Sequence, residues 1–278
     1  MPTASSSSPG LAPAQIRQFV RDGYVKLDHA FDASLAAAAR ARLWADAGAD
    51  PDDPATWTRP VVRLGWYADG PFAEAANTPL LHRAFDQLVG ESAWLPRDSL
   101  GTFPVRFPSR EDPGDAGWHI DPGFGMEAAP EDFLAWRTNI HTQGRALLML
   151  FLFSDVGRHD APTRLRVGSH RTMARRLHPA GEAGLALRDL VGTGLLPEGP
   201  VRDVQATGMA GTVYLCHPFL VHAAQPHRGT RPRFLAQPPL LPAAPLHEVA
   251  PDSPVLTAIR EALAEPPPQR RVRPVFFR

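Results

Sequence analysis

Two short stretches of the sequence carry side chains that can bind a divalent metal ion. The first is GWHIDPGF, residues 117–124, in which His119 and Asp121 stand two positions apart. Because alternate residues of a strand share a face, one imidazole and one carboxylate would point the same way here. Two histidines and one carboxylate bind non-haem iron and leave coordination positions open, so a second histidine is needed. By itself the pair is a weak indication, and the alternative is a strand end with a turn-forming aspartate before Pro122.

The second stretch is GTVYLCHPFLVHAAQPHRGTRPRF, residues 211–234, and it is rich in histidine and arginine. TVYLC has the composition of a strand, and a turn and another short strand follow it. A histidine at this place can cross a barrel and meet His119 and Asp121. An arginine on the next strand can face the metal and hold a carboxylate through a bidentate pair of hydrogen bonds. The candidates are His217, His222, His227, Arg228, Arg231 and Arg233.

Taken together, these motifs resemble those of a known family. His-x-Asp, Gly-Thr-Val-x-x-x-His-Pro-x-x-x-His and Arg-Pro-Arg are similar to the motifs of the phytanoyl-CoA dioxygenase family of Fe(II)/2-oxoglutarate oxygenases. IRQFVRDGYVKL resembles the N-terminal helix-to-strand segment of that family, and FSDVGRHDAPTRLRVGSH resembles its segment ending in Pro-Gly-Ser-His. The resemblance covers roughly residues 15–240. It implies a core built as a double-stranded β-helix, which is a jelly-roll, cupin-like architecture.

The resemblance also implies roles for individual residues. His119, Asp121 and His222 would be the catalytic ligands of Fe(II), with His222 at the second histidine of His-Pro-x-x-x-His. 2-Oxoglutarate would chelate the iron, and O2 would take the remaining position. Arg233 would bind the distal carboxylate of 2-oxoglutarate, because it stands eleven residues after His222, which is the usual spacing in the family. Arg231, nine residues after His222, is the competing candidate.

Other positions near the motifs add to this interpretation or depart from the family. Arg106, in PVRFP, is a second candidate for contact with 2-oxoglutarate or substrate, and the alternative is an arginine on a surface strand. Ala224 stands where the family often has a serine, which removes a possible hydroxyl contact to the co-substrate. The halogenating relatives have a small residue at the position of Asp121. The carboxylate therefore implies hydroxylation or a related oxidation.

Several further polar side chains have structural interpretations that compete with functional ones. His217 is predicted to pack beside the site, His227 to lie in a loop, and His170 to bond the backbone at a turn. Cys216 is predicted to be buried rather than nucleophilic. In WRTNIHTQGRA, alternate polar residues would share one face and line the pocket if the segment is a strand. These alternating residues are Arg137, Asn139 and His141.

The remaining sequence predicts helices first and then many short strands, and hence a mainly β chain with flanking helices. Asn77 is expected to start the third helix and Gly90 to end it. Helices are predicted over residues 11–23, 32–47, 77–90, 170–177, 182–192 and 253–264. Strands are predicted over residues 24–27, 101–107, 117–121, 145–156, 163–170, 211–222 and 232–241.

Length and composition limit the class of protein. The chain has 278 residues, 44% of them hydrophobic, and we expect a disordered tail over residues 1–10 and a single domain over residues 11–278. The formal net charge is zero, so no basic excess is present to bind nucleic acid. The single cysteine excludes an intramolecular disulfide bond. No long apolar run and no leader sequence is found, so we expect a cytoplasmic protein without membrane contact.

The sequence therefore predicts an Fe(II)- and 2-oxoglutarate-dependent dioxygenase that hydroxylates a small-molecule or natural-product substrate and releases succinate and CO2. Two alternatives remain open. One is a non-catalytic metabolite-binding module on the same barrel, and the other is a metal-dependent, cupin-like enzyme that does not use 2-oxoglutarate. The complete ligand set favours catalysis, and the arginine at the family spacing favours 2-oxoglutarate. The substrate and the oligomeric state are left open.

Overall fold

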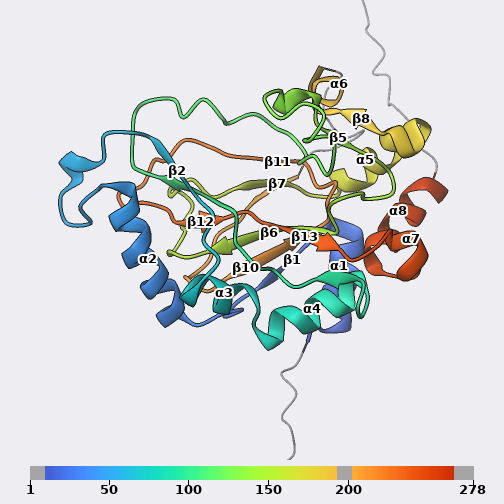
Figure 1. Ribbon diagram of the computed structural model, residues 1–278, viewed down its shortest axis with the longest axis horizontal. Coiled ribbons are helices and arrows are strands. Elements are labelled where there is room, and N and C mark those ends of the chain that lie inside the picture. Colours follow the sequence, from blue (N-terminus) through green and yellow to red (C-terminus); the bar gives the residue numbers. More distant parts are fainter. Residues whose placement is uncertain (1–9, 193–201, 266–278) are drawn as a thin grey trace, which may run out of the picture.

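The computed structural model describes residues 10–192 and 202–265, which form helices packed around antiparallel strands (Figure 1). Helix and strand are mixed, so the expectation of a mainly β chain is met only in part. All of the predicted N-terminal tail except Gly10 lies outside the described residues. Within the described part of the chain, no helix is both long enough and apolar enough to span a bilayer.

The larger of the sheets has the strand order β1-β10-β6-β13-β3, and β12 also pairs with β6. Strand β6, Leu147–Leu152, is buried at every position. All of its neighbours run antiparallel to it. The other strands of this sheet are β1 (Tyr24–Leu27), β3 (Trp94–Leu95), β10 (Val213–Cys216), β12 (Leu235–Ala236) and β13 (Pro239–Pro242).

A smaller sheet with the order β11-β7-β9 lies on one side of β6 (Figure 1). It consists of β7 (Arg164–Arg166), β9 (Asp203–Gln205) and β11 (His222–Ala223). Two further pairs of strands complete the β structure. They are β2 (Val61–Gly65) with β4 (Thr102–Arg106), and β5 (Arg137–Thr138) with β8 (Leu185–Ala186).

The two faces of β6 are buried against different partners. Leu148 and Leu150 belong to a core cluster that contains Leu165 of the smaller sheet, so the two sheets pack face to face. Leu147 and Met149 belong to the larger cluster, which contains side chains of the N-terminal helices. The alternation follows the two-residue period of a strand. Each fully buried leucine contributes about 2 kcal/mol through the hydrophobic effect, so β6 is the anchor of both layers.

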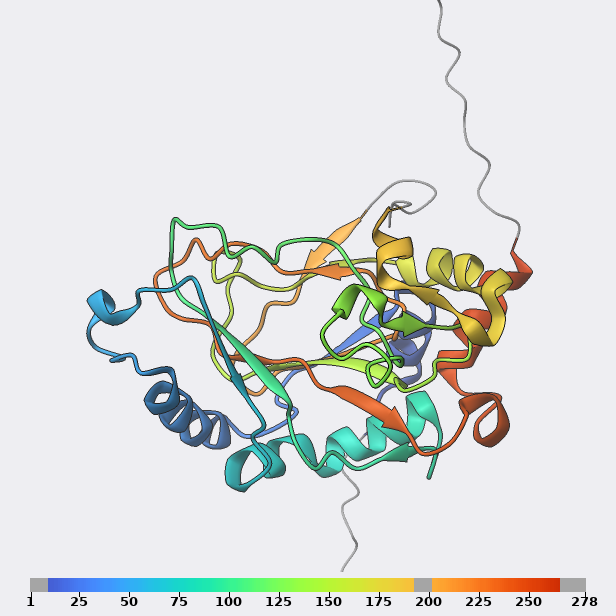
Figure 2. The ribbon, with the colours of Figure 1, turned by 45° about the horizontal axis from the view of Figure 1, so that its top comes forward.

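Helices cover the outer side of the larger sheet and one end of the molecule (Figure 2). The N-terminal ones are α1 (Pro13–Asp22), α2 (Ala33–Ala47), α3 (Gly70–Ala76) and α4 (Pro79–Val89). The later ones are α5 (Ser169–Leu177), α6 (Leu187–Gly192), α7 (Leu246–Val249) and α8 (Pro254–Ala264). Single 3-10 turns lie at Pro54–Thr56 and Phe133–Ala135, and a longer 3-10 segment spans His178–Ala183.

The helices agree with most of the sequence predictions, and the differences have local reasons. Helix α1 ends at Gly23, whose φ of 86° is the left-handed conformation that glycine adopts readily. Helix α4 begins after Thr78 instead of Asn77, because the Thr78 hydroxyl accepts the Leu81 N–H and caps the helix. Asn77 ends helix α3, which the sequence analysis missed because the helix has only 7 residues.

Most predicted strands are present but shorter than expected. The prediction is wrong for GWHID, which forms a single bridge at His119 instead of a strand. The sequence 211–222 splits into β10 and β11, separated by the turn at Pro218. The strand predicted over 163–170 is present only as β7, because Ser169 and His170 already belong to helix α5. The pairing of β7 with β11 places His222 opposite Leu165.

Candidate active site

The two histidines that the sequence proposes as metal ligands are brought together by the backbone. His119 and His222 form an isolated antiparallel bridge, in which each N–H donates to the carbonyl of the other at 2.9 Å. Residues directly opposite in such a pair project to the same face. The two imidazole rings therefore lie side by side, with centroids 4.4 Å apart. Strand β11 supplies His222, and the loop after β4 supplies His119.

Each imidazole is oriented by a carbonyl two residues earlier in the chain. Nδ1 of His119 lies 2.9 Å from the Gly117 carbonyl, and Nδ1 of His222 lies 3.1 Å from the Leu220 carbonyl. Because a carbonyl oxygen only accepts, Nδ1 carries the proton in both rings. The lone pair of each Nε2 is then free, which is the form that binds a metal ion.

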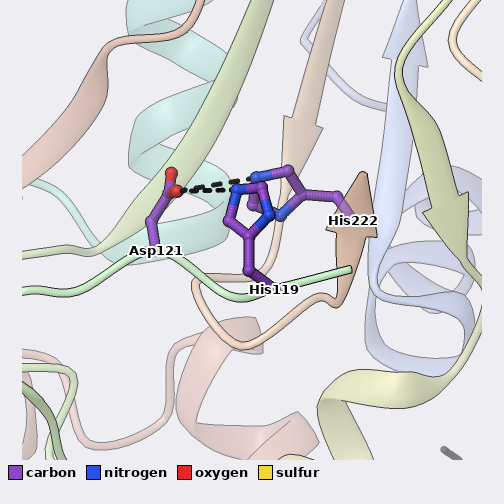
Figure 3. A group of neighbouring side chains, drawn as sticks. All are labelled: His119, Asp121 and His222. Atoms are coloured by element: carbon purple, nitrogen blue, oxygen red, sulfur yellow. Dashed lines mark ion pairs between the residues drawn. The ribbon is translucent and has the colours of Figure 1, made fainter. Parts of the chain in front are cut away.

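Asp121 directs one carboxylate oxygen at both imidazoles (Figure 3). Oδ1 is 3.6 Å from Nε2 of His119 and 3.5 Å from Nε2 of His222. The ligand atoms of the three residues all lie within 4.8 Å of one another. An ion about 2.1 Å from two ligands at right angles separates them by about 3 Å, so the three residues fit a divalent metal after a small contraction.

The electrostatic surroundings keep Asp121 and His119 in the forms that bind a metal ion. Burial alone would raise the pKa of Asp121, but Arg145, His222 and His119 together hold it well below its usual range. Burial, and then the neighbouring His222, lower the pKa of His119. At neutral pH the site therefore offers an ionised carboxylate and a neutral His119, as metal coordination requires.

A second bridge of the same kind joins the two arginines that the sequence proposes for 2-oxoglutarate. The Arg106 N–H donates to the Arg233 carbonyl at 3.0 Å, and the Arg233 N–H donates to the Arg106 carbonyl at 2.8 Å. Both side chains are therefore on one face, and both are buried. The competing candidate Arg231 is exposed. Of the two candidates Arg231 and Arg233, only Arg233 is therefore enclosed by the protein.

The guanidinium groups of this pair are only partly satisfied by protein groups. Arg233 donates to the carbonyls of Ala161 and Pro104, and Arg106 donates to Asp115 at 2.7 Å. Among the described residues, Nε of Arg233 and both Nε and Nη1 of Arg106 are buried without a hydrogen-bond partner. Burial and the neighbouring Arg106 charge lower the pKa of Arg233 to about 9. An added carboxylate would satisfy these N–H groups and offset the repulsion.

Three residues beside the ligands have no counterpart in the sequence analysis. Asp115 pairs with both Arg106 and Arg63, Arg145 pairs with Asp121, and Arg164 donates to backbone carbonyls near both motifs. For Arg145 a signal was present, because it stands just before the buried apolar strand β6, whereas Arg164 is the first residue of β7, whose sequence RLR gives no such signal. For Asp115 no such signal exists in the sequence.

The remaining histidines and Cys216 have structural roles. Nε2 of His170 donates to the Val20 carbonyl at 3.0 Å, which confirms the predicted backbone contact. His217 is buried beside it, with ring centroids 4.9 Å apart. His227 lies in a loop as predicted, but it is buried. Burial raises the pKa of the Cys216 thiol, so the thiol is protonated and Cys216 is a packing residue.

The segment WRTNIHTQGRA does not form the predicted continuous strand. Strand β5 covers only Arg137 and Thr138, and a turn follows it. Asn139 is buried and bonds Gln143 and the Glu182 carbonyl, so its role is to hold the turn. His141 lines a separate pocket of about 550 Å³ that contains none of the three proposed ligands.

The chain shares its fold with solved structures that include a non-haem, α-ketoglutarate-dependent enzyme and two proteins solved with 2-oxoglutarate bound. Among them are the carbocyclase SnoK from nogalamycin biosynthesis (TM-score 0.53, 18% identity, 83% of this chain and 84% of that chain) and iron-bound HygX from Streptomyces hygroscopicus (0.52, 18%, 84% and 88%). EctD from S. alaskensis, with 2-oxoglutarate and 5-hydroxyectoine, aligns at 0.50 and 22%, over 84% and 76%. No family model matches the sequence, and no curated protein matches it.

Proposed function

We propose that the protein is an Fe(II)- and 2-oxoglutarate-dependent dioxygenase, built as one double-stranded β-helix domain over residues 11–278. The observation that carries the proposal is the convergence of Oδ1 of Asp121 on Nε2 of both His119 and His222, at 3.6 and 3.5 Å. These three atoms would hold the iron. A facial set of two histidines and one carboxylate is the ligand set of non-haem iron oxygenases, which leaves three positions open.

The buried arginine pair supports 2-oxoglutarate as the co-substrate. Arg233 would bind the distal carboxylate, and Arg106 would add to the positive field around it. Ala224 has no hydroxyl to contribute, so the unpartnered N–H groups of the two arginines are the donors that remain. A metal-dependent cupin-like enzyme without 2-oxoglutarate would have no use for two enclosed guanidinium groups beside the metal ligands.

The protein groups would bind, orient and exclude water, and the chemistry would come from the cofactors. When bound, iron, 2-oxoglutarate and O2 supply oxidation of an unactivated C–H bond, with release of succinate and CO2. The carbonyls of Gly117 and Leu220 fix the imidazole protons on Nδ1, so neither ligand ring changes its protonation during turnover. The enclosed Arg233 would hold the distal carboxylate of 2-oxoglutarate and so orient the co-substrate in the site.

We propose hydroxylation of a small molecule as the reaction. As a metal ligand, Asp121 would take the position that a halide needs in the halogenating relatives, which favours oxygen transfer to the substrate. HygX has been solved with hygromycin B, and EctD with 5-hydroxyectoine, so enzymes of this fold take small-molecule ligands. SnoK is a carbocyclase, so the outcome of the oxidation differs within the fold. A cytoplasmic location stays a prediction.

An anaerobic titration tests the proposal. The full-length protein would be stripped of metal and given Fe(II) and then 2-oxoglutarate, and the weak visible charge-transfer band of a chelated keto acid would be recorded. We expect the band in the wild-type protein, and a higher 2-oxoglutarate requirement in Arg233→Met. The exposed Arg231→Met is the matched control and should behave as wild type.

Each alternative has its own outcome in this experiment. Absence of the band at saturating Fe(II) and 2-oxoglutarate would reject the oxygenase and leave the cupin-like enzyme. A band without succinate formation when O2 and candidate substrates are added would favour the binding module. A band that depends on Arg231 instead of Arg233 would overturn the co-substrate assignment.

A further inference from the structure

The two oxygens of Asp121 have different partners. Oδ1 faces the two imidazoles, whereas Oδ2 lies 3.2 Å from Nη1 of Arg145. Nη2 of Arg145 lies 3.3 Å from the carbonyl of Pro122, the residue that follows. One guanidinium therefore contacts both the side chain of the proposed ligand and the backbone next to it. Oδ2 is held away from the position that a metal would occupy.

Because the Arg145 side chain is mostly buried, it has little access to partners other than Asp121. Its side chain is only 12% exposed, and that of Asp121 is 20% exposed. Among the described residues, Asp121 is the only carboxylate that forms an ion pair with Arg145. Nε and Nη1 of Arg145 are buried and lack a hydrogen-bond partner of good geometry in the described part of the chain. A buried cation with one anionic partner is strongly destabilised when that partner turns away, so the pair resists rotation of the carboxylate.

The backbone places Arg145 at this position from two directions. The turn before it packs directly on the segment after Asp121: a Cβ on Gly144 would lie 1.8 Å from the Gly123 carbonyl oxygen, and one on Gly123 would lie 2.0 Å from that of Gln143. The residue after it, Ala146, donates its N–H to the Leu240 carbonyl at 2.8 Å and enters the buried strand β6. Arg145 is thus fixed between the sheet and the ligand loop.

We propose that Arg145 is a positioning residue of the metal centre: it holds Oδ2 of Asp121 so that only Oδ1 can coordinate. A carboxylate free to rotate can chelate a metal through both oxygens and fill one of the positions that the co-substrate needs. The Arg145 contact prevents this. The inference rests on the metal centre proposed above and adds to it a residue that touches neither metal nor co-substrate.

Two physical effects of Arg145 on metal binding have opposite signs, so an affinity measurement separates them. The guanidinium repels a nearby cation, and if repulsion dominated, removing Arg145 would tighten metal binding. The guanidinium also orients a ligand, and removal of such an outer partner weakens metal binding about 10–100-fold. The proposal requires the second outcome.

Cobalt(II) binding to the metal-free, full-length protein tests this without turnover. Equilibrium dialysis would give the affinity, and the d–d absorption of bound Co(II) would report its coordination number. We expect Arg145→Met to bind Co(II) at least about 10-fold more weakly, with an altered d–d intensity because the carboxylate is free to chelate. Arg145→Lys keeps the charge and one donor, so it should recover part of the affinity.

A matched control separates positioning from general packing. Arg175 also has a buried Nε without a partner in the described part of the chain, and it donates to the Ala262 carbonyl at 3.0 Å, but it lies on α5 away from the three proposed ligands. Arg175→Met should bind Co(II) as the wild type does. Thermal unfolding of each metal-free variant would show whether it is folded. If Arg145→Met is not, Arg145→Lys and Arg145→Gln carry the comparison, with Lys expected to bind Co(II) more tightly than Gln.

The possible failures point to different conclusions. If the wild-type protein binds no Co(II), the proposed metal centre is wrong and this inference falls with it. If the wild-type protein binds Co(II) and Arg145→Met binds it equally well or better, the proposed role of Arg145 is wrong whatever the d–d absorption, and the metal centre itself still stands. An equal loss of affinity in Arg175→Met would show that the effect is one of packing and would also overturn the proposal.

Discussion

Both halves of the candidate site are built on an isolated antiparallel bridge, but their side chains differ in how many hydrogen-bond partners they have. His119 and His222 face each other across one isolated bridge, and Arg106 and Arg233 face each other across another. In the histidine bridge each Nδ1 has its own carbonyl, and each Nε2 is free to bind. In the arginine bridge three buried N–H groups have no partner among the described residues. The first half thus has the ligand forms that a cation would need, whereas the second half keeps unpaired donors for a further anion besides Asp115.

This difference indicates that the histidine half can bind a metal ion without a bound co-substrate, whereas the arginine half is stabilised when a carboxylate binds. A preorganised ligand set binds metal without help, because its tautomers are fixed and its carboxylate is ionised. A pair of like charges held together in a buried place gains most when a carboxylate arrives between them. We therefore expect the metal to bind when 2-oxoglutarate is absent, and 2-oxoglutarate to stabilise the protein by relieving the repulsion within the arginine pair.

Removal of a metal ligand should have the largest effect. His222→Ala deletes one of the three proposed ligands and leaves the backbone bridge in place, since the bridge uses only main-chain atoms. We expect Co(II) affinity to fall by more than the about 100-fold upper limit for an outer partner, and iron-dependent turnover to be lost. Equilibrium dialysis and a succinate assay would measure both. Wild-type affinity in this variant would remove His222 from the ligand set.

Loss of one guanidinium should have the next largest effect, and only on the co-substrate half. Truncating one partner of a buried charge pair costs about 2 kcal/mol or more, which is about 30-fold in affinity. Arg233→Met should therefore raise the 2-oxoglutarate concentration needed for the charge-transfer band about 30-fold, with Co(II) affinity unchanged. The rise in melting temperature on adding 2-oxoglutarate should also disappear. A variant that lost both metal and 2-oxoglutarate binding would contradict the independence of the two halves.

The sequence predicts the histidine half better than the arginine half, for a physical reason. His119 and Asp121 are two residues apart, and His222 lies in a distinctive histidine-rich segment, so local spacing suffices to propose them together. Arg231 and Arg233 have the same parity, and only the packed sheets show that Arg233 is enclosed. The Asp115 contact to Arg106 depends on the course of a long loop, which no local pattern specifies.

The contact of Arg145 with Asp121 is another feature that the sequence does not predict. Its sequence context, TQGRALLML, predicts the buried strand that follows it and nothing about its partner. Its contact with Asp121 exists because the turn at Gly144 meets the backbone at Gly123 with no room for a side chain on either glycine. Such a backbone contact joins two segments that the sequence keeps apart, and it becomes visible only in three dimensions. Local sequence patterns predict helices and strands. The contacts around the proposed ligands depend instead on how loops distant in the sequence pack together.

His170, which lies outside the site, should make the free energy of unfolding depend on pH in the acid range. This role contrasts with that of the two histidines proposed to bind metal. Burial lowers the pKa of His170 to about 4, against about 6.5 in the unfolded chain. The unfolded state then binds more protons below pH 6.5, so the free energy of unfolding falls as pH falls and levels off below pH 4. At pH 5 the loss amounts to about 2 kcal/mol.

Chemical denaturation at pH 7 and pH 5 would measure this. We expect the metal-free protein to lose about 2 kcal/mol or more of unfolding free energy over this interval, and His170→Gln to lose about 2 kcal/mol less than the wild type. His217, whose pKa burial also lowers well below its usual value, contributes in the same direction. An identical pH dependence in wild type and His170→Gln would show that His170 is not the titrating group.

The smallest effect should come from Arg164, which links the segments that carry the two histidines. Its Nη2 donates to the carbonyls of Ala116 and Ala224, both at 3.0 Å, and its guanidinium lies 4.6 Å from the centre of the Trp118 ring. Arg166 lies over the same ring at 3.8 Å but pairs with Asp203 and not with those carbonyls. Each contact is worth about 1 kcal/mol.

The two arginines thus form a matched pair that separates stacking from the link between segments. Arg164→Met and Arg166→Met should each lower the unfolding free energy by about 1–2 kcal/mol, because each loses a contact with Trp118. Only Arg164→Met should also weaken Co(II) binding, by a few-fold, because it alone frees the segments before His119 and after His222 to move relative to each other. Equal Co(II) affinities in the two variants would show that the backbone bridge between His119 and His222 holds the ligands without this side chain.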